Sequence, residues 1–190
     1  MFFLYVIPVG LLIGLLARGK IANLGKLPLR WVGLLFPALL IQLLIFPVFT
    51  SDALIPFATA PLHILSYALL AVWILANCRL LPIVTLGLGA VCNFAVLAAN
   101  GGFMPASANA LQQAGLSNLA GTLTREGAYS NLALMSADTR LNLLGDLLYV
   151  PKWIPLSAAF SIGDLLIALA LVWLIVKGMR INEKRPIEAA

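Results

Sequence analysis

The stretch Leu81–Ala99, LPIVTLGLGAVCNFAVLAA, contains no charged residue along its whole length. A membrane-spanning helix needs about 20 consecutive, mostly apolar residues, so this stretch predicts a transmembrane helix. Four other runs in the chain have comparable composition, namely Phe2–Ala17, Trp31–Thr50, Ala58–Ala76 and Ser157–Val176. The sequence therefore predicts an all-α polytopic membrane helix bundle of five transmembrane spans, forming one domain over residues 1–190.

The composition of the whole chain agrees with this prediction. Of its 190 residues 62% are hydrophobic and only 10% are charged, whereas soluble domains carry about 25% charged residues. This balance excludes a soluble enzyme, a nucleic-acid-binding protein and a disordered scaffold. Two cysteines, Cys78 and Cys92, are too few for a disulfide framework, and we expect both to behave as small apolar side chains.

The basic residues predict the orientation of the spans. Nine of the twelve lie in the segments 18–30, 79 and 177–185, which alternate with the segments that carry most of the acidic residues. Basic residues favour the cytoplasmic side of a bilayer. In the first run the charges follow the apolar stretch, unlike those of a cleaved signal peptide, so we expect a retained span. The pattern predicts a multi-pass protein of a bacterial cytoplasmic membrane, with its N-terminus outside and its C-terminus inside.

The long outer segment 100–156 predicts short helices at the outer face of the membrane. Ser107 can cap a first helix that Gly115 ends. Leucines recurring over Ser130–Leu148 predict a second helix. Pro151 and Pro155 then interrupt the chain before the last span. Trp153 and Tyr149 suit the boundary between lipid and water.

Polar residues within the spans gather at one depth in the outer half of the membrane. His63, Asn93 and Asp164 lie about 7–10 Å below the outer ends of their spans at 1.5 Å per residue, with Gln42 and Tyr67 slightly deeper. Side-chain hydrogen bonds between spans would explain such residues without a binding role. An ionisable carboxyl at this depth, however, requires a partner or a proton. The functional interpretation is an outward-facing polar pocket, whose expected binding residues are His63, Tyr67, Asn93, Asn100, Arg140 and Asp164.

Two Gly-Asp steps, Gly145–Asp146 and Gly163–Asp164, flank the entry into the last span. A turn between them could bring the two carboxyls together to share a proton, which is the basis of aspartic-protease chemistry. The alternative is that Asp146 is an exposed residue that pairs with Arg140 or a backbone amide, while Asp164 faces the bundle alone. We expect the second arrangement.

The sequence favours neither a metal site nor a cofactor. It has one histidine and no pair of His or Cys residues at ligand spacing. A bis-histidine haem within one chain is therefore excluded, and no glycine-rich phosphate loop occurs. The Asn100-Gly101-Gly102 step is instead interpreted as a sharp turn at the membrane surface.

Several short motifs together resemble a bacterial family of small polytopic membrane proteins that is known as a domain of unknown function. The resemblance covers roughly residues 5–180, and the family brings no known activity with it. The motifs are Gly10-Leu-Leu-Ile-Gly-Leu-Leu with Arg18-Gly19, Leu29-Arg30, Gln42, Asn100-Gly-Gly-Phe-Met-Pro105, Leu144-Gly-Asp146 and Ser161-Ile-Gly-Asp164.

A second resemblance is to lipoprotein signal peptidase, a membrane aspartic peptidase. Asp138-Thr-Arg140, Asp146 and Phe160-Ser-Ile-Gly-Asp164 are similar in order and spacing to the motifs of that family. Ser161 stands where the family has Asn, and Gly163 stands where it has Ala. The resemblance implies that Asp146 and Asp164 form a catalytic dyad.

Three classes of function follow from these observations. The preferred one is a non-catalytic subunit or binding module of a membrane assembly, with the outer pocket for lipid, quinone or a partner. A membrane aspartic peptidase is the alternative. A transporter is the third, although the two halves of the chain show no symmetry of the kind transporters have. The expected partners are membrane lipids and other membrane protein chains or further copies of this one, and no nucleic acid.

Overall fold

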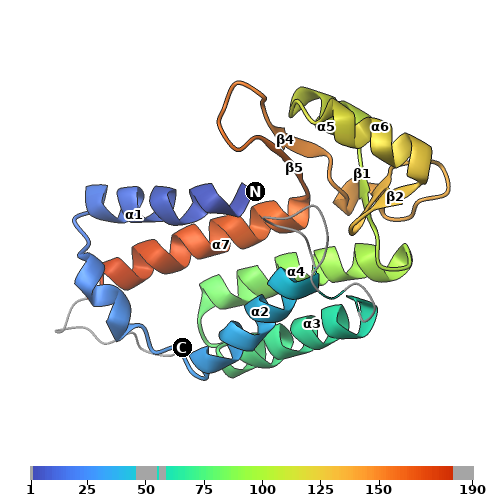
Figure 1. Cartoon of the computed structure of the whole chain (residues 1–190). Coiled ribbons are helices and arrows are strands. Elements are labelled where there is room, and N and C mark those ends of the chain that lie inside the picture. Colours follow the sequence, from blue (N-terminus) through green and yellow to red (C-terminus); the bar gives the residue numbers. More distant parts are fainter. Residues whose placement is uncertain (1, 46–54, 56–58, 182–190) are drawn as a thin grey trace.

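The computed structural model describes residues 2–45, 55 and 59–181 (Figure 1). It is mostly helical, and its long helices correspond to the five predicted runs. They are α1 (Val6–Leu16, preceded by the 3-10 turn η1, Phe2–Tyr5), α2 (Leu35–Ile45, preceded by η3, Val32–Leu34), α3 (Thr59–Ala76), α4 (Leu81–Ala99) and α7 (Ile162–Met179). A further 3-10 turn, η2 (Ile21–Lys26), lies between α1 and α2. The predicted end of the second run, residues 46–50, lies outside the described residues.

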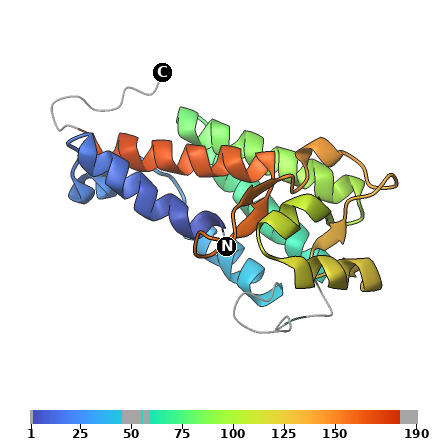
Figure 2. The same cartoon turned by 90° about the horizontal axis from the view of Figure 1, so that it is seen from above.

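The five helices lie side by side, and α7 runs between α1 and α4 (Figures 1 and 2). Gly10 and Gly14 of α1 face Ile175 and Met179 of α7, so these two helices run parallel. The pairs α2–α3, α3–α4 and α4–α7 are antiparallel. The direction of the chain therefore alternates from α1 to α4, and α7 runs in the same direction as α1 and α3.

This alternation gives the molecule two different ends. At the basic end, the chain after α1 folds onto the end of α7, where the Lys20 N–H donates to the Met179 carbonyl at 2.8 Å. The α3–α4 turn lies at the same end. The described basic residues gathered there are Arg18, Lys20, Lys26, Arg30, Arg79, Lys177 and Arg180. A buried cluster of Trp73, Leu80, Ile83 and Leu174 holds this end together.

Two of the helices, α4 and α7, are long and apolar enough to cross a membrane. The described parts of the other three are apolar but shorter, spanning Phe3–Leu16, Val32–Ile45 and Pro61–Ala76. Large apolar side chains are exposed on the outside of the bundle, including Leu16 at 77%, Phe36 at 72% and Leu75 at 70%. An apolar surface of this extent is unusual for a soluble monomer. These features support association with a membrane.

The outer segment contains strands as well as helices, which corrects the all-α prediction. β1 (Met104–Ala106) pairs in parallel with β3 (Leu132–Leu134), and β3 pairs antiparallel with β2 (Ala128–Tyr129). β4 (Leu148–Val150) and β5 (Ala158–Phe160) form an antiparallel pair just before α7. We call this side of the molecule, opposite to the basic end, the sheet end.

The predicted helix over Ser130–Leu148 is wrong. These residues form β3, the 3-10 turn η4 (Asn142–Leu144) and the start of β4. Leu132 and Leu134 alternate at the spacing of a strand, and their pairing partners come from β1, far away in the sequence. Ser130 and Leu141 have positive φ angles of 56°, which interrupt helical geometry.

The first predicted outer helix is confirmed. α5 (Ala108–Gln113) begins after Ser107, whose side chain accepts a hydrogen bond from the Ala110 N–H. Gly115, with φ +73°, follows its end, as the left-handed residue after a helix usually does. A second helix, α6 (Ser117–Glu126), was not predicted; its buried Leu123 joins Leu111 in a small core of the outer segment. The Asn100-Gly101-Gly102 turn is also present, with positive φ at both glycines.

Candidate functional site

A ring of three hydrogen-bonded side chains lies where α7 begins. Asn93 of α4 donates from Nδ2 to Asp164 Oδ1 at 2.7 Å, and Ser161 Oγ donates to Asn93 Oδ1 at 2.8 Å. Ser161 and Asp164 complete a capping box, because each side chain also binds the backbone N–H of the other. The predicted need of Asp164 for a partner is met by these bonds.

Two glycines let α4 and α7 approach closely enough to form this ring. A Cβ atom on Gly89 would lie 2.5 Å from the Gly163 carbonyl oxygen, and one on Gly163 would overlap the Asn93 amide. Small residues at such crossings are typical of helix packing in membranes. The ring is therefore held by both backbone contact and hydrogen bonds, and Ser161 is fully buried within it.

A second polar group lies on α2 and α3. Gln42 Nε2 donates to Ser66 Oγ, which in turn donates to the His63 carbonyl at 2.7 Å. Ser66 is 2% exposed. The Ser66 hydroxyl accepts one hydrogen bond and donates another. The side-chain oxygen of Gln42 has no hydrogen bond to any described residue.

The two polar groups face a common cavity of about 240 Å³ between α2, α3, α4 and α7. Four of the residues that the sequence placed at one depth line it, namely Gln42, Tyr67, Asn93 and Asp164. Apolar side chains, among them Phe3 and Leu70, form the remaining wall. The described lining residues include one carboxylate, that of Asp164, and no basic side chain.

An apolar groove of about 530 Å³ adjoins the cavity, between α3 and α4. Its lining includes Ile64, Ile74, Leu88 and Phe94, and it has almost no polar surface. Tyr67, Leu70 and Ala90 line both the groove and the cavity. The polar cavity and the apolar groove therefore share a wall, and of its three residues Tyr67 is the one with a polar group.

Aromatic rings position Tyr67 on α3. Its ring centroid lies 5.0 Å from that of His63 and 5.5 Å from that of Phe94, both in tilted arrangements, the geometry that aromatic pairs favour. His63 thus contacts the Tyr67 ring from the preceding turn of α3 but does not line the cavity. The Tyr67 hydroxyl has no hydrogen bond to the described residues.

Asn100 and Arg140 lie outside the cavity. The Asn100 side chain donates to the Arg140 carbonyl at 2.9 Å and accepts from the Arg140 N–H at 2.7 Å. It holds the loop before η4 against the end of α4, which is a structural role. The Arg140 guanidinium belongs to an exposed residue and makes no ion pair within the described ranges.

Asp146 is buried, with 8% of its surface exposed. Its backbone pairs with the end of β1, through its N–H to the Pro105 carbonyl at 2.9 Å and its carbonyl to the Ser107 N–H at 3.0 Å. Burial, with a further contribution from the charge of Asp164, raises the pKa of Asp146 to about 7. The predicted exposed position and local pairing with Arg140 are therefore wrong, because strand pairing carries this residue into the interior.

The sequence reasoning missed two residues of the site, Ser66 and Ser161. The spacing Ser161-x-x-Asp164 is that of a capping box at a helix start, and this signal was available in the sequence. Ser66 has no comparable signal, since a single serine in an apolar run is common. Among the described residues no three His, Cys, Asp or Glu side chains gather as a metal site would require.

The fold and the site define a helical protein with an apolar outer surface, a partly open cavity lined by polar side chains from four helices, and a small mixed subdomain at one end. A family model, described as a family of unknown function (DUF5317), matches residues 26–176. The chain belongs to this family, in agreement with the resemblance drawn from its motifs. Comparison with curated proteins and with solved structures gave no match.

Proposed function

We propose that this chain is a five-span protein of the cytoplasmic membrane, built as one domain, that binds an amphipathic membrane molecule between α2, α3, α4 and α7. The observation that carries the proposal is the shared wall of the polar cavity and the apolar groove at Tyr67, Leu70 and Ala90. An apolar tail fits the groove, and a polar head fits the cavity.

The charges of the cavity select the kind of head. Among the described residues of the wall, Asp164 is the one carboxylate, and no basic side chain offsets it. An anionic phosphate would be repelled at this position. A carbonyl or hydroxyl oxygen of a neutral head can instead accept from the Tyr67 hydroxyl, and a head that carries a hydroxyl can also donate to the side-chain oxygen of Gln42. The ligand class is therefore a quinone or a lipid with an uncharged head.

The size of the cavity agrees with a head group rather than a whole ligand. Pockets for complete small molecules usually span about 300–1,000 Å³, and this cavity has about 240 Å³. The remainder of the ligand would occupy the groove of about 530 Å³. In this proposal the protein binds its ligand without catalysing a reaction. It would act as a subunit of a larger membrane assembly or of a homo-oligomer.

Binding is tested with the detergent-purified protein, a short-chain ubiquinone and a diacylglycerol, by native mass spectrometry. Tyr67→Phe removes one hydroxyl and should weaken binding of the preferred ligand about 2- to 10-fold, the range for a neutral hydrogen bond. Tyr149→Phe, at an exposed position of β4, is the matched control. Failure of both ligands to bind, or equal binding by the Tyr67→Phe variant, would exclude the proposal.

The five-span topology is tested separately with a native cysteine. Cys78 is exposed in the α3–α4 turn at the basic end, so the proposed orientation places it on the cytoplasmic side. In a Cys92→Ala background, an impermeant maleimide should label Cys78 only after the cells are permeabilised. Labelling in intact cells would reverse the topology.

A membrane aspartic peptidase is the second candidate function. It is favoured by the electrostatic interaction between the buried Asp146 and Asp164, since a pKa of about 7 for Asp146 suits a residue that exchanges a proton near neutral pH. Against it, both oxygens of Asp164 already accept hydrogen bonds from Asn93 and the Ser161 N–H. Cleavage of a lipidated peptide by the purified protein, abolished by both Asp146→Asn and Asp164→Asn, would establish the peptidase and displace the binding function.

A further inference from the structure

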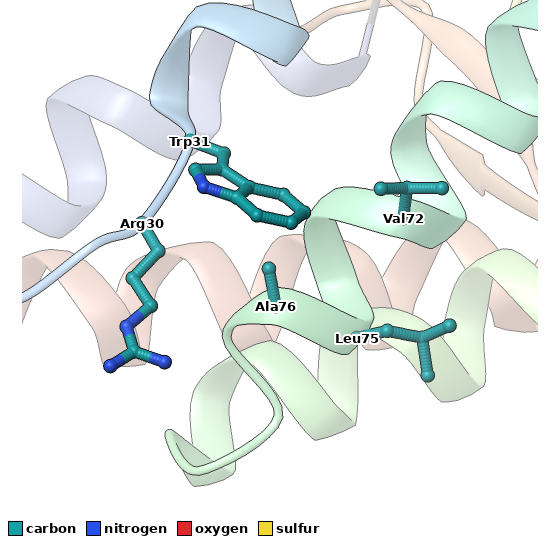
Figure 3. A pocket seen from close by; sticks show the side chains of 5 residues that line it. All are labelled: Arg30, Trp31, Val72, Leu75 and Ala76. Carbon is teal, nitrogen blue, oxygen red and sulfur yellow. The ribbon is translucent and has the colours of Figure 1, made fainter.

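Besides the polar cavity and the apolar groove, a hollow of about 520 Å³ lies at the basic end of the bundle. Arg30 and Trp31 line it from the chain before η3, and Val72, Leu75 and Ala76 line it from the end of α3 (Figure 3). Figure 3 shows the Trp31 ring extending over Ala76 toward Val72, with the Arg30 side chain on the other side of the opening. We call it the Arg30 hollow.

A buried asparagine fixes the backbone that carries these two side chains. Asn77 accepts from the Arg30 N–H at 2.7 Å and donates to the Arg30 carbonyl at 3.0 Å. Its amide also donates to the Trp73 carbonyl of the preceding helical turn at 2.8 Å. Asn77 is 3% exposed, so a buried side chain directly after α3 holds both polar backbone groups of Arg30.

Trp31 has an uncommon backbone conformation. Its φ of 52° and ψ of 38° lie in the left-handed region, which bulky residues rarely adopt and which often marks a functional position. This conformation, next to the clamped Arg30, directs the indole over the α3 surface while 65% of the residue stays exposed. The exposed ring is therefore held in place rather than buried as part of the core.

Among the described residues, the surroundings of the hollow carry positive charge that no acidic side chain offsets. The described acidic residues, Glu126, Asp138, Asp146 and Asp164, all belong to the outer segment or to the start of α7 at the sheet end. Arg30 is exposed and forms no ion pair with any residue that the structure describes. An arginine in this setting has its planar set of N–H donors available for an anion.

We propose that the Arg30 hollow binds the phosphate of an anionic membrane lipid. The guanidinium can hold two phosphate oxygens at once, and the indole suits the level of lipid head groups. Val72 and Leu75, exposed at 43% and 70%, offer an apolar surface along which the first part of an acyl chain can lie. This site is independent of the proposed cavity ligand and differs from it in charge.

The test measures binding of phosphatidylglycerol to the full chain in phosphatidylcholine nanodiscs at 0.15 M salt. Arg30→Gln should weaken binding at least about tenfold, because a hydrogen-bonded charge pair is lost. Lys20→Gln removes a charge from the same end but outside the lining of the hollow, and it should change binding less than about threefold. Equal losses in the two variants would show general attraction to the membrane and would overturn the site.

Two further arms identify the chemistry of the ligand. Arg30→Lys keeps the charge but not the planar pair of donors, and it should still lose about threefold or more. Unchanged binding by this variant would contradict recognition of phosphate by the guanidinium. Inorganic phosphate at millimolar concentration should not displace the lipid, and complete displacement would assign the hollow to a soluble phosphate instead.

Discussion

The two sides of α4 differ in how they meet their neighbours. Toward α7, Gly89 packs against the α7 backbone and Asn93 belongs to the buried polar ring. Toward α3, Gly87 faces only the Ile74 side chain, and an apolar groove of about 530 Å³ separates parts of the two helices. The α7-facing side of α4 is therefore fixed by backbone contact and hydrogen bonds. On the α3-facing side, larger side chains keep the two helices apart along the groove.

If the bundle spans a membrane as proposed, this difference would make it both stable and accessible. In lipid, close packing and hydrogen bonds hold helices together, because apolar burial alone gives little preference for protein over acyl chains. The α4–α7 side uses both means. The α3–α4 side uses neither extensively, so a ligand can enter there without disturbing the polar ring.

The largest expected effect concerns the charge of Asp146, which is buried at the sheet end. The pKa of this carboxyl is raised from 3.8 to about 7. Between about pH 4 and 7 the folded protein therefore keeps a proton that the unfolded chain has already lost. Stability should therefore be greatest below about pH 4 and should fall as the pH rises to about 7, by up to about 4 kcal/mol. Asp146→Asn should remove this dependence and be more stable than the wild type at pH 8.

Thermal unfolding of the detergent-purified protein at several pH values measures the effect of Asp146. Asp138→Asn, at an exposed loop position, is the control and should keep the wild-type profile. Identical pH profiles for the wild type and Asp146→Asn would contradict the burial of this carboxyl.

A matched pair of glycines tests the comparison directly. In Gly89→Ala the new methyl group would meet the Gly163 carbonyl oxygen and Ile167, neither of which can move freely. We expect a loss of about 3 kcal/mol from overpacking. In Gly87→Ala the nearest atom is Cγ2 of Ile74 at 3.0 Å, and the better helix propensity of Ala offsets the contact, so stability should change by less than about 1 kcal/mol. Equal melting temperatures for the two variants would refute the difference between the two sides.

Loss of the carboxyl in the polar ring should have the next largest effect. Asp164→Ala removes the capping box of α7 and the partner of Asn93, which should cost about 2 kcal/mol. Denaturant unfolding compared with Asp138→Ala, at an exposed site, measures the difference. If both variants lose the same stability, the ring contributes no more than a surface residue.

The smallest effect on stability is expected from filling the groove. Ala71→Leu places a larger apolar side chain into the lining on α3, where it should change the free energy of unfolding by less than about 1 kcal/mol. It should nevertheless abolish binding of the quinone or diacylglycerol. Ala98→Leu, on an exposed face of α4, is the control; retained binding by Ala71→Leu would show that the groove does not hold the ligand.

The parts of the fold that depend on local sequence were predictable. Leu81–Ala99 is a helix with the predicted bounds because it lacks charges, has Pro82 in its first turn and ends before the Asn100-Gly101-Gly102 turn. Rise per residue fixes depth in a straight helix, and of the five polar residues expected at one depth Gln42, Tyr67, Asn93 and Asp164 line one cavity. Depth does not fix rotation about the helix axis, and His63 therefore lies beside the cavity rather than in its wall.

The parts that depend on distant partners were not predictable. β3 exists because Met104–Ala106 lies beside it, and nothing in the leucine spacing of 130–148 identifies that partner. The burial of Asp146 follows from the same sheet end, where its backbone pairs with Pro105 and Ser107. The Arg30 hollow likewise depends on Asn77, which lies 47 residues later in the chain.

The shared wall at Tyr67 has a consequence for how affinity should be expressed. A ligand that enters through the α3–α4 groove comes from the lipid phase and need not cross bulk water. The occupancy of the site then follows the mole fraction of the ligand in the bilayer. A modest intrinsic affinity is therefore enough for a minor component of the membrane to fill the site. Detergent dilutes that phase, and the protein extracted with more detergent should therefore retain less ligand even where every contact in the cavity is unchanged.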